Sequence, residues 1–258
     1  MTTRVVKFGG RAQGDSALPT LLAAAAQAPG ARVVVVHGGG DDVSAMQRRL
    51  GLEPQFVGGR RVTSEADLEV VRMLLSGTVN KRLVAQLVTA GVRAVGLSGE
   101  DAGLLSARVT DPTFGRVGRD VLADVRVLAD LLAAGWLPVI SPLARDRDSA
   151  DGAGLNVNGD DAATAVAVAL QAQELCFIAD VEGVLNGGQR IPQLDPAAIQ
   201  ALAARGVVQG GMLAKLEAAV AALEAGVGAI RIGTLACLGD PQAGTTIVSS
   251  VPATQGNP

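Results

Sequence analysis

The sequence is poor in histidine, cysteine and aromatic residues, and each shortage argues against a class of function. Its 258 residues include one histidine, two cysteines, one tryptophan and no tyrosine. Cys176 and Cys237 form no CxxC pair, so the chain has too few soft ligands for a dedicated metal site of its own. Four phenylalanines and one tryptophan also offer few surfaces on which bases could stack, which argues against single-stranded nucleic acid.

Positive charge and long apolar runs are scarce as well. The formal net charge is −3, so no basic field is available to hold a nucleic-acid backbone. The longer apolar stretches, such as residues 21–26, fall far short of the roughly 20 residues that a membrane span needs. No secretory signal is recognisable at the N-terminus. We therefore expect a cytoplasmic protein without disulfides that binds neither membranes nor nucleic acid.

Several common catalytic motifs are missing. The sequence has no P-loop, no GxGxxG dinucleotide motif, no protein-kinase signature and no HExxH zinc motif. A serine hydrolase would have to pair His37 with Ser98, whose surrounding sequence lacks the glycine spacing of a nucleophile elbow. If the protein is an enzyme, its catalytic residues must therefore follow a less common motif.

The hydrophobic pattern is that of an α/β protein, in which short β-branched runs alternate with longer segments of helical spacing. Residues 55–62 are expected to be extended, residues 104–120 and the stretch after 179 to form hairpins, and residues 145–159 to be a loop. Strands are predicted at residues 4–8, 32–36, 93–97, 137–140, 174–179, 229–233 and 245–248. Helices are predicted at residues 16–28, 41–50, 64–87, 195–205 and 211–225, from Asp120 to near Gly135, and from Asp160 onward.

Two glycine clusters directly follow predicted strands. The first is Lys7-Phe-Gly-Gly10 and the second is His37-Gly-Gly-Gly40. Glycine lets backbone amides approach an anion, and ligands of parallel sheets bind beyond the carboxyl ends of the strands. The first cluster opens with one of only three lysines among 22 basic residues, as though a compact ammonium were required there. Together the clusters predict a phosphate site.

The order and spacing of eight short motifs give the chain its resemblance to a known family. Over residues 5–248 it resembles the amino-acid kinase family. Besides the two glycine clusters, the motifs are Gly59-Arg-Arg-Val-Thr63, Gly77-Thr-Val-Asn-Lys81, Val95-Gly-Leu-Ser-Gly99, Asn156-Val-Asn-Gly-Asp160, Asp180-Val-Glu-Gly-Val184 and Gly210-Gly-Met-Leu-Ala-Lys215.

The resemblance implies a fold and a reaction. The fold is a three-layer αβα sandwich with a central, mainly parallel sheet, in which residues 1–150 bind the acceptor and dimerise and residues 151–258 bind the nucleotide. The reaction is phosphoryl transfer from ATP, with Mg²⁺ carried on its phosphates, to the side-chain carboxylate of N-acetyl-L-glutamate, the second step of arginine biosynthesis. Because no extra helix precedes the first strand, we expect a homodimer that arginine does not inhibit.

The family pattern also implies roles for individual residues. Lys7 and Lys215 stabilise the transition state and Asp160 organises them. The acceptor is bound by Gly39, Gly40, Arg61 and Asn156. The nucleotide is bound by Gly9, Gly10, Asp180, Val181, Glu182, Gly183, Val184, Leu185, Val207, Val208 and Gln209.

Elementary chemistry agrees with these roles. A carboxylate acceptor has a reference pKa of about 4.3 and is already ionised at neutral pH, so no general base is needed. The reaction instead needs positive groups that cancel the repulsion between two anions, which two ammonium groups and glycine amides supply. Asp160 would fix both lysines and keep them protonated, and the fork of Arg61 suits the second acceptor carboxylate.

Some residues depart from the family pattern. Arg11 stands where the family usually has a small polar residue, Gly159 where it has alanine, and Glu100 where it often has lysine. Away from these positions, Lys81 and His37 are expected to have structural roles. Cys176, Cys237 and Trp136 are expected to pack in the core or at its edge.

Two other functions stay open at this stage. One is a kinase for glutamate or 2-aminoadipate attached to a carrier protein, although no basic stretch suggests docking of an acidic carrier. The other is a non-catalytic amino-acid sensor that kept the fold, against which the retention of both lysines and Asp160 argues. Release of ADP by the purified protein would distinguish an enzyme from a sensor.

Overall fold

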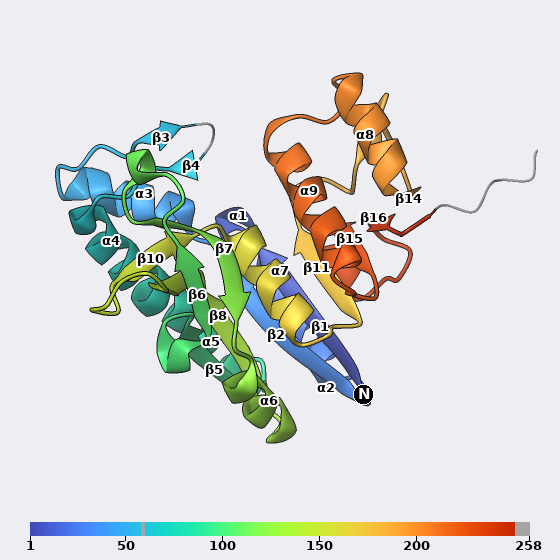
Figure 1. Ribbon diagram of the computed structural model, residues 1–258. Helices are drawn as coiled ribbons and strands as arrows, with labels where there is room; N and C mark the ends of the chain where they lie inside the picture. Colours follow the sequence, from blue (N-terminus) through green and yellow to red (C-terminus); the bar gives the residue numbers. More distant parts are fainter. Residues whose placement is uncertain (58–59, 251–258) are drawn as a thin grey trace, which may run out of the picture.

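An eight-stranded sheet forms the centre of the protein, in the order β14-β16-β15-β11-β1-β2-β8-β5 (Figure 1). The computed structural model describes residues 1–57 and 60–250, without the side chains of residues 10 and 11. Neighbouring strands run parallel except for β15 and β16, which are antiparallel. The strands are β1 (Thr2–Phe8), β2 (Ala31–His37), β5 (Ala94–Ser98), β8 (Leu137–Ser141), β11 (Glu174–Ile178), β14 (Gln193–Leu194), β15 (Ile230–Gly233) and β16 (Thr245–Ile247).

Helices cover both faces of this sheet because successive residues of a buried strand point to opposite sides. In β2, Val34 and Val36 belong to one apolar cluster and Val33 and Val35 to another. The first cluster joins the sheet to α7 (Gly159–Ala169), α9 (Gly210–Glu224) and α6 (Arg126–Ala133), and the second joins it to α2 (Leu18–Gln27) and α5 (Asn80–Thr89). The predicted three-layer αβα sandwich is confirmed.

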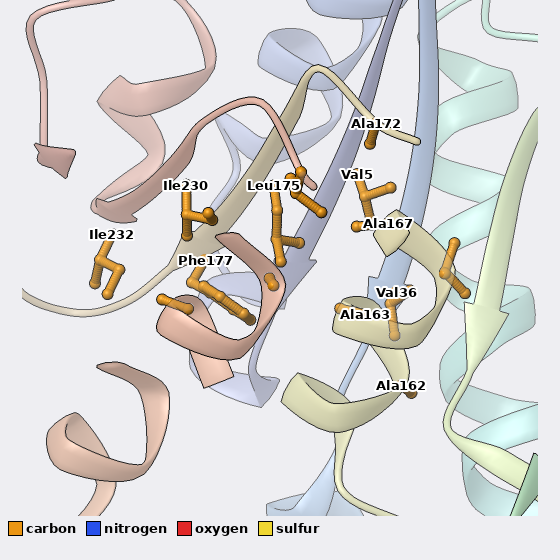
Figure 2. Close-up of a cluster of buried hydrophobic side chains, with 14 of the residues drawn as sticks. Val5, Val36, Ala162, Ala163, Ala167, Ala172, Leu175, Phe177, Ile230 and Ile232 are labelled. Carbon is orange, nitrogen blue, oxygen red and sulfur yellow. The ribbon is translucent and has the colours of Figure 1, made fainter. Parts of the chain in front are cut away.

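The core is built from small and aliphatic side chains, as the scarcity of aromatic residues requires. Figure 2 shows Ala163 and Ala167 of α7 close to Val5 and Val36 of the sheet. Alanine on the inner side of a helix lets the helix axis approach the strands closely, because no longer side chain intervenes. This close approach brings the first turn of α7 to the ends of β1 and β2.

The long helix predicted at residues 64–87 is present as a continuous helical segment from Glu65 to Thr89. Ser64 caps α4 (Glu65–Arg72) in a capping box with Asp67. The helix continues through a π-helical segment, η1 (Met73–Val79), into α5. The remaining helices are α1 (Gly10–Gln13), α3 (Gly40–Arg49) and α8 (Pro196–Ala204), with short 3₁₀ turns η2 (Asp101–Gly103), η3 (Pro112–Phe114) and η4 (Leu235–Leu238).

Smaller strands lie outside the main sheet. Four of them close into a small barrel, and two hairpins occupy the extended segment near residue 57 and the stretch after β11. The barrel strands are β6 (Leu105–Arg108), β7 (Val117–Ala123), β9 (Leu143–Asp146) and β10 (Gly154–Val157), and the hairpins are β3 (Phe56–Val57) with β4 (Arg60–Arg61) and β12 (Leu185–Asn186) with β13 (Gln189–Arg190).

Two predictions in this region were wrong. No helix opens at Asp120, because β7 continues to Ala123 and Asp120 takes a left-handed conformation with φ of 51°. The residue that accepts a hydrogen bond from the start of α6 is Asp124, at 3.2 Å from the Arg126 amide. Residues 145–159 are not one loop, since β9 and β10 pair with each other across a shorter turn.

Among the described residues, no helix combines the length and the apolar character needed to cross a bilayer.

Candidate active site

Both glycine clusters lie at the same edge of the sheet. Strands β1 and β2 pair in parallel with Phe8 opposite His37, so the residues that follow each strand emerge side by side. The Gly38 amide donates to the Phe8 carbonyl at 2.8 Å and ties the two loops together. Asn158 caps the start of α7 at this edge, where its side chain accepts from the Asp160 amide at 2.7 Å. An anion here meets loop amides and a helix N-terminus together.

Asp160 joins two lysines that are far apart in the sequence. Lys7 Nζ lies 2.7 Å from Asp160 Oδ1, and Lys215 Nζ lies 2.8 Å from Asp160 Oδ2. Lys7 comes from β1, Asp160 from the first turn of α7 and Lys215 from the second turn of α9. Their side chains are only 13%, 15% and 13% exposed. One carboxylate thus holds two ammonium groups in a partly dry setting.

The charges of this triad do not cancel. Burial would raise the pKa of Asp160, but the positive charges of Lys7 and Lys215 outweigh it and hold that pKa below its usual value. Burial lowers the pKa of Lys215, and the positive charge of Lys7 lowers it further, against the opposing pull of Asp160. The Lys215 ammonium also lies 5.2 Å from the centre of the Phe177 ring. With two cations on one carboxylate, an additional anion would be electrostatically favourable.

Two members of the triad line a cavity of about 320 Å³ at the end of the sheet, whereas Lys215 contacts Asp160 without lining that cavity. Lys7 and Asp160 line it, together with glycines from both loops and the predicted acceptor residues Arg61 and Asn156. The other lining residues are Gly9, Gly38, Gly39, Gly40, Phe56, Arg60, Val117, Gly118, Arg119, Val157, Asn158, Gly159 and Asp161. Positive side chains therefore face one space of a size suited to a small dicarboxylate or a terminal phosphoryl group.

Arg61 is held firmly at the cavity wall. The Nη2 atom of Arg61 donates to the Gly40 carbonyl at 2.8 Å and to Ser44 Oγ at 2.7 Å, while its Nη1 atom donates to Gln47 Oε1. The guanidinium carbon lies 4.7 Å from the centre of the Phe56 ring. Because a guanidinium has five N–H donors, this anchoring still leaves donors for a carboxylate.

Asn156 is anchored by a neighbouring hydroxyl. Its amide nitrogen donates to Thr63 Oγ1 at 3.1 Å, and its backbone is held in the barrel, where β10 pairs with β7. The Thr63 amide and carbonyl in turn bond to the Phe114 carbonyl and the Arg116 amide. The cavity wall that contains Arg61 and Asn156 is therefore built by the barrel on one side and α3 on the other.

Of the predicted nucleotide residues that the structure describes in full, the cavity lining includes only Gly9. Gly9 lines it, and Gly10 begins α1. Residues 180–185 follow β11, the other neighbour of β1, and residues 207–209 lead directly into α9. Neither segment lines the cavity. Val184 and Val208 are buried, and the Val184 amide donates to Thr245 Oγ1 at 2.8 Å, so these two side chains serve the packing of the segment.

Some residues around the site were not predicted. Arg60, Arg119 and Asp161 line the cavity, and only their adjacency to Arg61 and Asp160 could have pointed to two of them. Gln13 and Asn80 contact the second glycine loop and were not predicted as site residues. Asn80 lies in the motif Gly77-Thr-Val-Asn-Lys81, whereas Gln13 belongs to none of the motifs. His37 does make the expected structural hydrogen bond, through Nδ1 to the Gly38 carbonyl at 2.7 Å.

The expected structural role of Lys81 agrees with its contacts. Its ammonium donates to Asn80 Oδ1 at 3.0 Å and to the Gly96 carbonyl at 3.2 Å. Cys176 and Cys237 are buried and free, as expected for core residues. Trp136 lies at the edge of the core, where the guanidinium carbon of Arg93 is 4.6 Å from the centre of the Trp136 ring.

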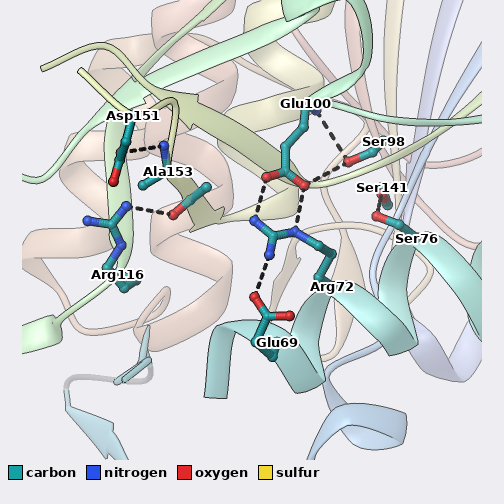
Figure 3. Close-up of polar contacts among 10 residues, drawn as sticks. Glu69, Arg72, Ser76, Ser98, Glu100, Arg116, Ser141, Asp151 and Ala153 are labelled. Atoms are coloured by element: carbon teal, nitrogen blue, oxygen red, sulfur yellow. Dashed lines mark hydrogen bonds and ion pairs between the residues drawn. The ribbon is translucent and has the colours of Figure 1, made fainter. Parts of the chain in front are cut away.

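The three departures from the family pattern have different surroundings. A Cβ atom on Gly159 would lie 3.2 Å from Lys7 Cε, so the glycine leaves room for that lysine. Glu100 receives two hydrogen bonds from Arg72, at 2.8 and 3.1 Å, and fastens α4 to the loop after β5 (Figure 3). The Arg11 side chain and Gly59 lie outside the described part of the structure. Across the described ranges, no group of three His, Cys, Asp or Glu residues is arranged to hold a metal ion.

Comparison with known proteins gives a consistent result. The model of the "Amino acid kinase family" matches residues 2–234. An acetylglutamate kinase from Chloroflexus aurantiacus is 46% identical over 93% of this chain and 94% of its own length, and one from Cereibacter sphaeroides is 44% identical over 96% and 88%. The solved structure of smu.665 from Streptococcus mutans UA159 superposes with a TM-score of 0.84 at 30% identity, covering 96% of this chain and 99% of that one. The chain belongs to the amino acid kinase family.

Proposed function

We propose that this protein is an ATP-dependent acetylglutamate kinase. It phosphorylates the side-chain carboxylate of N-acetyl-L-glutamate to give N-acetyl-L-glutamyl 5-phosphate, the second step of arginine biosynthesis. Relatives of that name at 43–46% identity over most of the chain support the substrate assignment. The observation that carries the chemistry is the Asp160 carboxylate with Lys7 and Lys215 on its two oxygens beside a cationic cavity.

The proposed reaction needs charge neutralisation and alignment but no base. An acceptor carboxylate oxygen attacks the γ-phosphorus of ATP, the new P–O bond forms, and the bond to the β–γ bridging oxygen breaks to release ADP. The carboxylate is already ionised at neutral pH, so no proton has to be removed. Mg²⁺ enters as part of the MgATP substrate. Lys7 and Lys215 lower the energy of the charge that spreads over the transferred group.

Acceptor binding falls to the residues around the second glycine loop. Arg61 takes the carboxylate that does not react, and Asn156 and the Gly40 backbone fix the rest of the molecule. Gly39 meets the acceptor at its reacting carboxylate, where the phosphoryl group arrives. Gly9, Gly10 and residues 180–185 and 207–209 bind the nucleotide. In this proposal residues 1–150 form the acceptor lobe and residues 151–258 the nucleotide lobe, which meet at the shared triad; residues 251–258 lie outside the described part.

A trap for the acyl phosphate tests the activity. Purified protein is incubated with MgATP, hydroxylamine and one of three acceptors: N-acetyl-L-glutamate, L-glutamate or N-acetyl-2-aminoadipate. We expect hydroxamate and ADP to form with N-acetylglutamate and at most weakly with the other two. A preference for either other acceptor contradicts the assignment. No ADP release with any of them points to a carrier-linked acceptor or a non-catalytic sensor.

The proposal includes a homodimer that arginine does not inhibit. Sedimentation velocity on the purified protein should give the mass of two chains, and millimolar arginine should leave the rate of ADP formation unchanged. A ring of six chains, or inhibition by arginine, would contradict this part of the proposal without affecting the assigned reaction.

A further inference from the structure

The carbonyl of Gly38 is held by two buried side chains. His37, which is fully buried, places Nδ1 2.7 Å from this oxygen, and Gln13, 5% exposed, donates from Nε2 at 2.8 Å. A carbonyl oxygen can only accept, so the proton of the imidazole must be on Nδ1. Both side chains therefore pull the same carbonyl toward the interior.

Asn80 fixes the opposite side of the imidazole. Its amide nitrogen donates to the Val139 carbonyl at 2.8 Å and lies 3.2 Å from His37 Nε2, while its oxygen accepts from Lys81 Nζ at 3.0 Å. Because the Val139 carbonyl requires the amide nitrogen to face it, Nε2 of His37 receives an N–H and must be unprotonated. The histidine is locked in one neutral tautomer.

This arrangement determines where the next amide points. In a trans peptide the C=O of Gly38 and the N–H of Gly39 point in opposite directions, and the described chain has no cis peptide bonds. Gly38, Gly39 and Gly40 all line the cavity. Gly39 also lies directly on η1, since a Cβ atom there would be 2.7 Å from Leu75 Cδ2.

We propose that His37 is a positioning residue which, with Gln13 and Asn80, holds the Gly38 carbonyl inward and thereby aims the Gly39 amide at the transferred phosphoryl group. The inference rests on the proposed kinase function. An amide fixed in advance stabilises charge in the transition state without the cost of turning the peptide during the reaction.

The environment of His37 supports a permanently neutral ring. Burial lowers its pKa from 6.5 to about 4, against the hydrogen bond to Gly38, and the positive charges of Lys81 and Arg82 lower it further. At neutral pH the imidazole therefore remains a donor through Nδ1 and an acceptor through Nε2. It takes no part in proton transfer.

Three variants and one control separate positioning from packing. His37→Phe keeps a buried ring without the donor, His37→Asn keeps an amide donor near the position of Nδ1, and Gln13→Met removes the second donor at similar volume. Ser141→Ala is the control, because Ser141 is fully buried at the end of β8 and bonds only to Ser76 among the interactions described for its side chain (Figure 3). It removes a buried hydrogen bond of the same edge without touching Gly38.

Two measurements report on the amide. We expect His37→Phe to lower kcat at least about tenfold with little change in KM for the acceptor, Gln13→Met to lower it less, and His37→Asn to recover most of the loss. Binding of Mg²⁺, ADP and aluminium fluoride, a mimic of the transferred group, should weaken in His37→Phe relative to ADP alone. Both values should stay near those of the unsubstituted protein in Ser141→Ala.

The outcomes are distinct. Equal kcat and fluoride-complex affinity in soluble His37→Phe and Ser141→Ala would overturn the inference, as would a His37→Asn variant no better than His37→Phe. If His37→Phe fails to fold, Gln13→Met and His37→Asn decide the matter by the same two measurements. A protein inactive on N-acetylglutamate would refute the proposed function, whereas the fluoride-complex binding would still test the amide.

Discussion

At the scale of single residues, the proposed mechanism depends most on Lys7 and Lys215, the two lysines that contact Asp160. Replacing Lys7 or Lys215 by alanine removes one of the two cations on Asp160, which the proposed mechanism directs at the transferred group. We expect kcat to fall about 100- to 1,000-fold, the cost of a lost donor to a developing oxyanion. Steady-state kinetics together with far-UV circular dichroism would show whether the loss is catalytic.

The matched control for these variants is Arg108→Ala. Arg108 pairs with Asp148 on the surface at 3.3 Å and is 54% exposed, so its removal costs little. A lysine variant that turns over as fast as Arg108→Ala would remove that lysine from the proposed mechanism. A variant that unfolds would instead report on the buried carboxylate left with one partner.

His37 gives the protein a specific dependence of stability on pH. Its pKa is about 4 when folded and about 6.5 when unfolded, so the unfolded state binds the extra proton between these values. The free energy of unfolding should therefore fall as the pH drops from about 6.5 to about 4, by up to about 3 kcal/mol from this group. Urea titrations of the protein and of His37→Asn at pH 7, 5.5 and 4.5 measure the difference.

The comparison with His37→Asn isolates the histidine. Asp160 also loses its stabilising contribution in acid, because its folded pKa is lowered and its carboxylate must be protonated, but it does so in both proteins and at lower pH. If the two proteins lose stability in parallel between pH 7 and 4.5, His37 is not held neutral.

At the scale of elements, the start of α7 balances helix stability against room for Lys7. Gly159→Ala should stabilise the helix, because alanine loses less backbone freedom, but by less than the roughly 0.5–1 kcal/mol of an interior position, since Gly159 is the first residue of α7. The new Cβ would lie 3.2 Å from Lys7 Cε, so the lysine must shift by a few tenths of an ångström. We expect a higher melting temperature and a kcat several-fold lower.

Gly77→Ala is the control for this exchange. Gly77 lies inside η1, and nothing lies within 4 Å of the position of its Cβ, so alanine should add stability without altering turnover. An unchanged kcat in Gly159→Ala would mean that Lys7 tolerates the displacement. Thermal melts and steady-state rates on both proteins are sufficient.

At the scale of the whole molecule, one sheet passes through both proposed lobes. β1 pairs with β2 on one side and with β11 on the other, so neither half has a complete sheet alone. We expect urea unfolding to be a single transition, with Trp136 fluorescence and far-UV circular dichroism changing together. Two separated transitions would show that the lobes unfold independently.

The parts of this architecture that depend on local pattern were predictable. Some features can be recognised from a few consecutive residues. They are the apolar run of β2, the cap at Ser64 and the glycine clusters after β1 and β2. Parallel pairing then brings the clusters together, since strands that end at one edge deliver their loops to one place.

The parts that depend on distant partners were not predictable. Asp120 has the chemistry of a helix cap, yet pairing in the barrel keeps it in β7. Gln13 belongs to no motif, and the motif that contains Asn80 does not show which residues Asn80 contacts. The two side chains converge on Gly38 and His37 only through the packing of α1 and α5. Arg119 reaches the cavity from the barrel for the same reason.

The central place of β1 has a consequence for biosynthesis. A ribosome delivers this strand before the other strands of the sheet, and its partner β11, with Glu174 opposite Arg4, emerges roughly ten to thirty seconds later at ordinary elongation rates. Throughout that interval the nascent strand has one unpaired side flanked by Val5 and Val6, a template for association between neighbouring polysomal chains. We therefore expect chaperone protection and the speed of translation across residues 9–173 to affect the yield of folded protein.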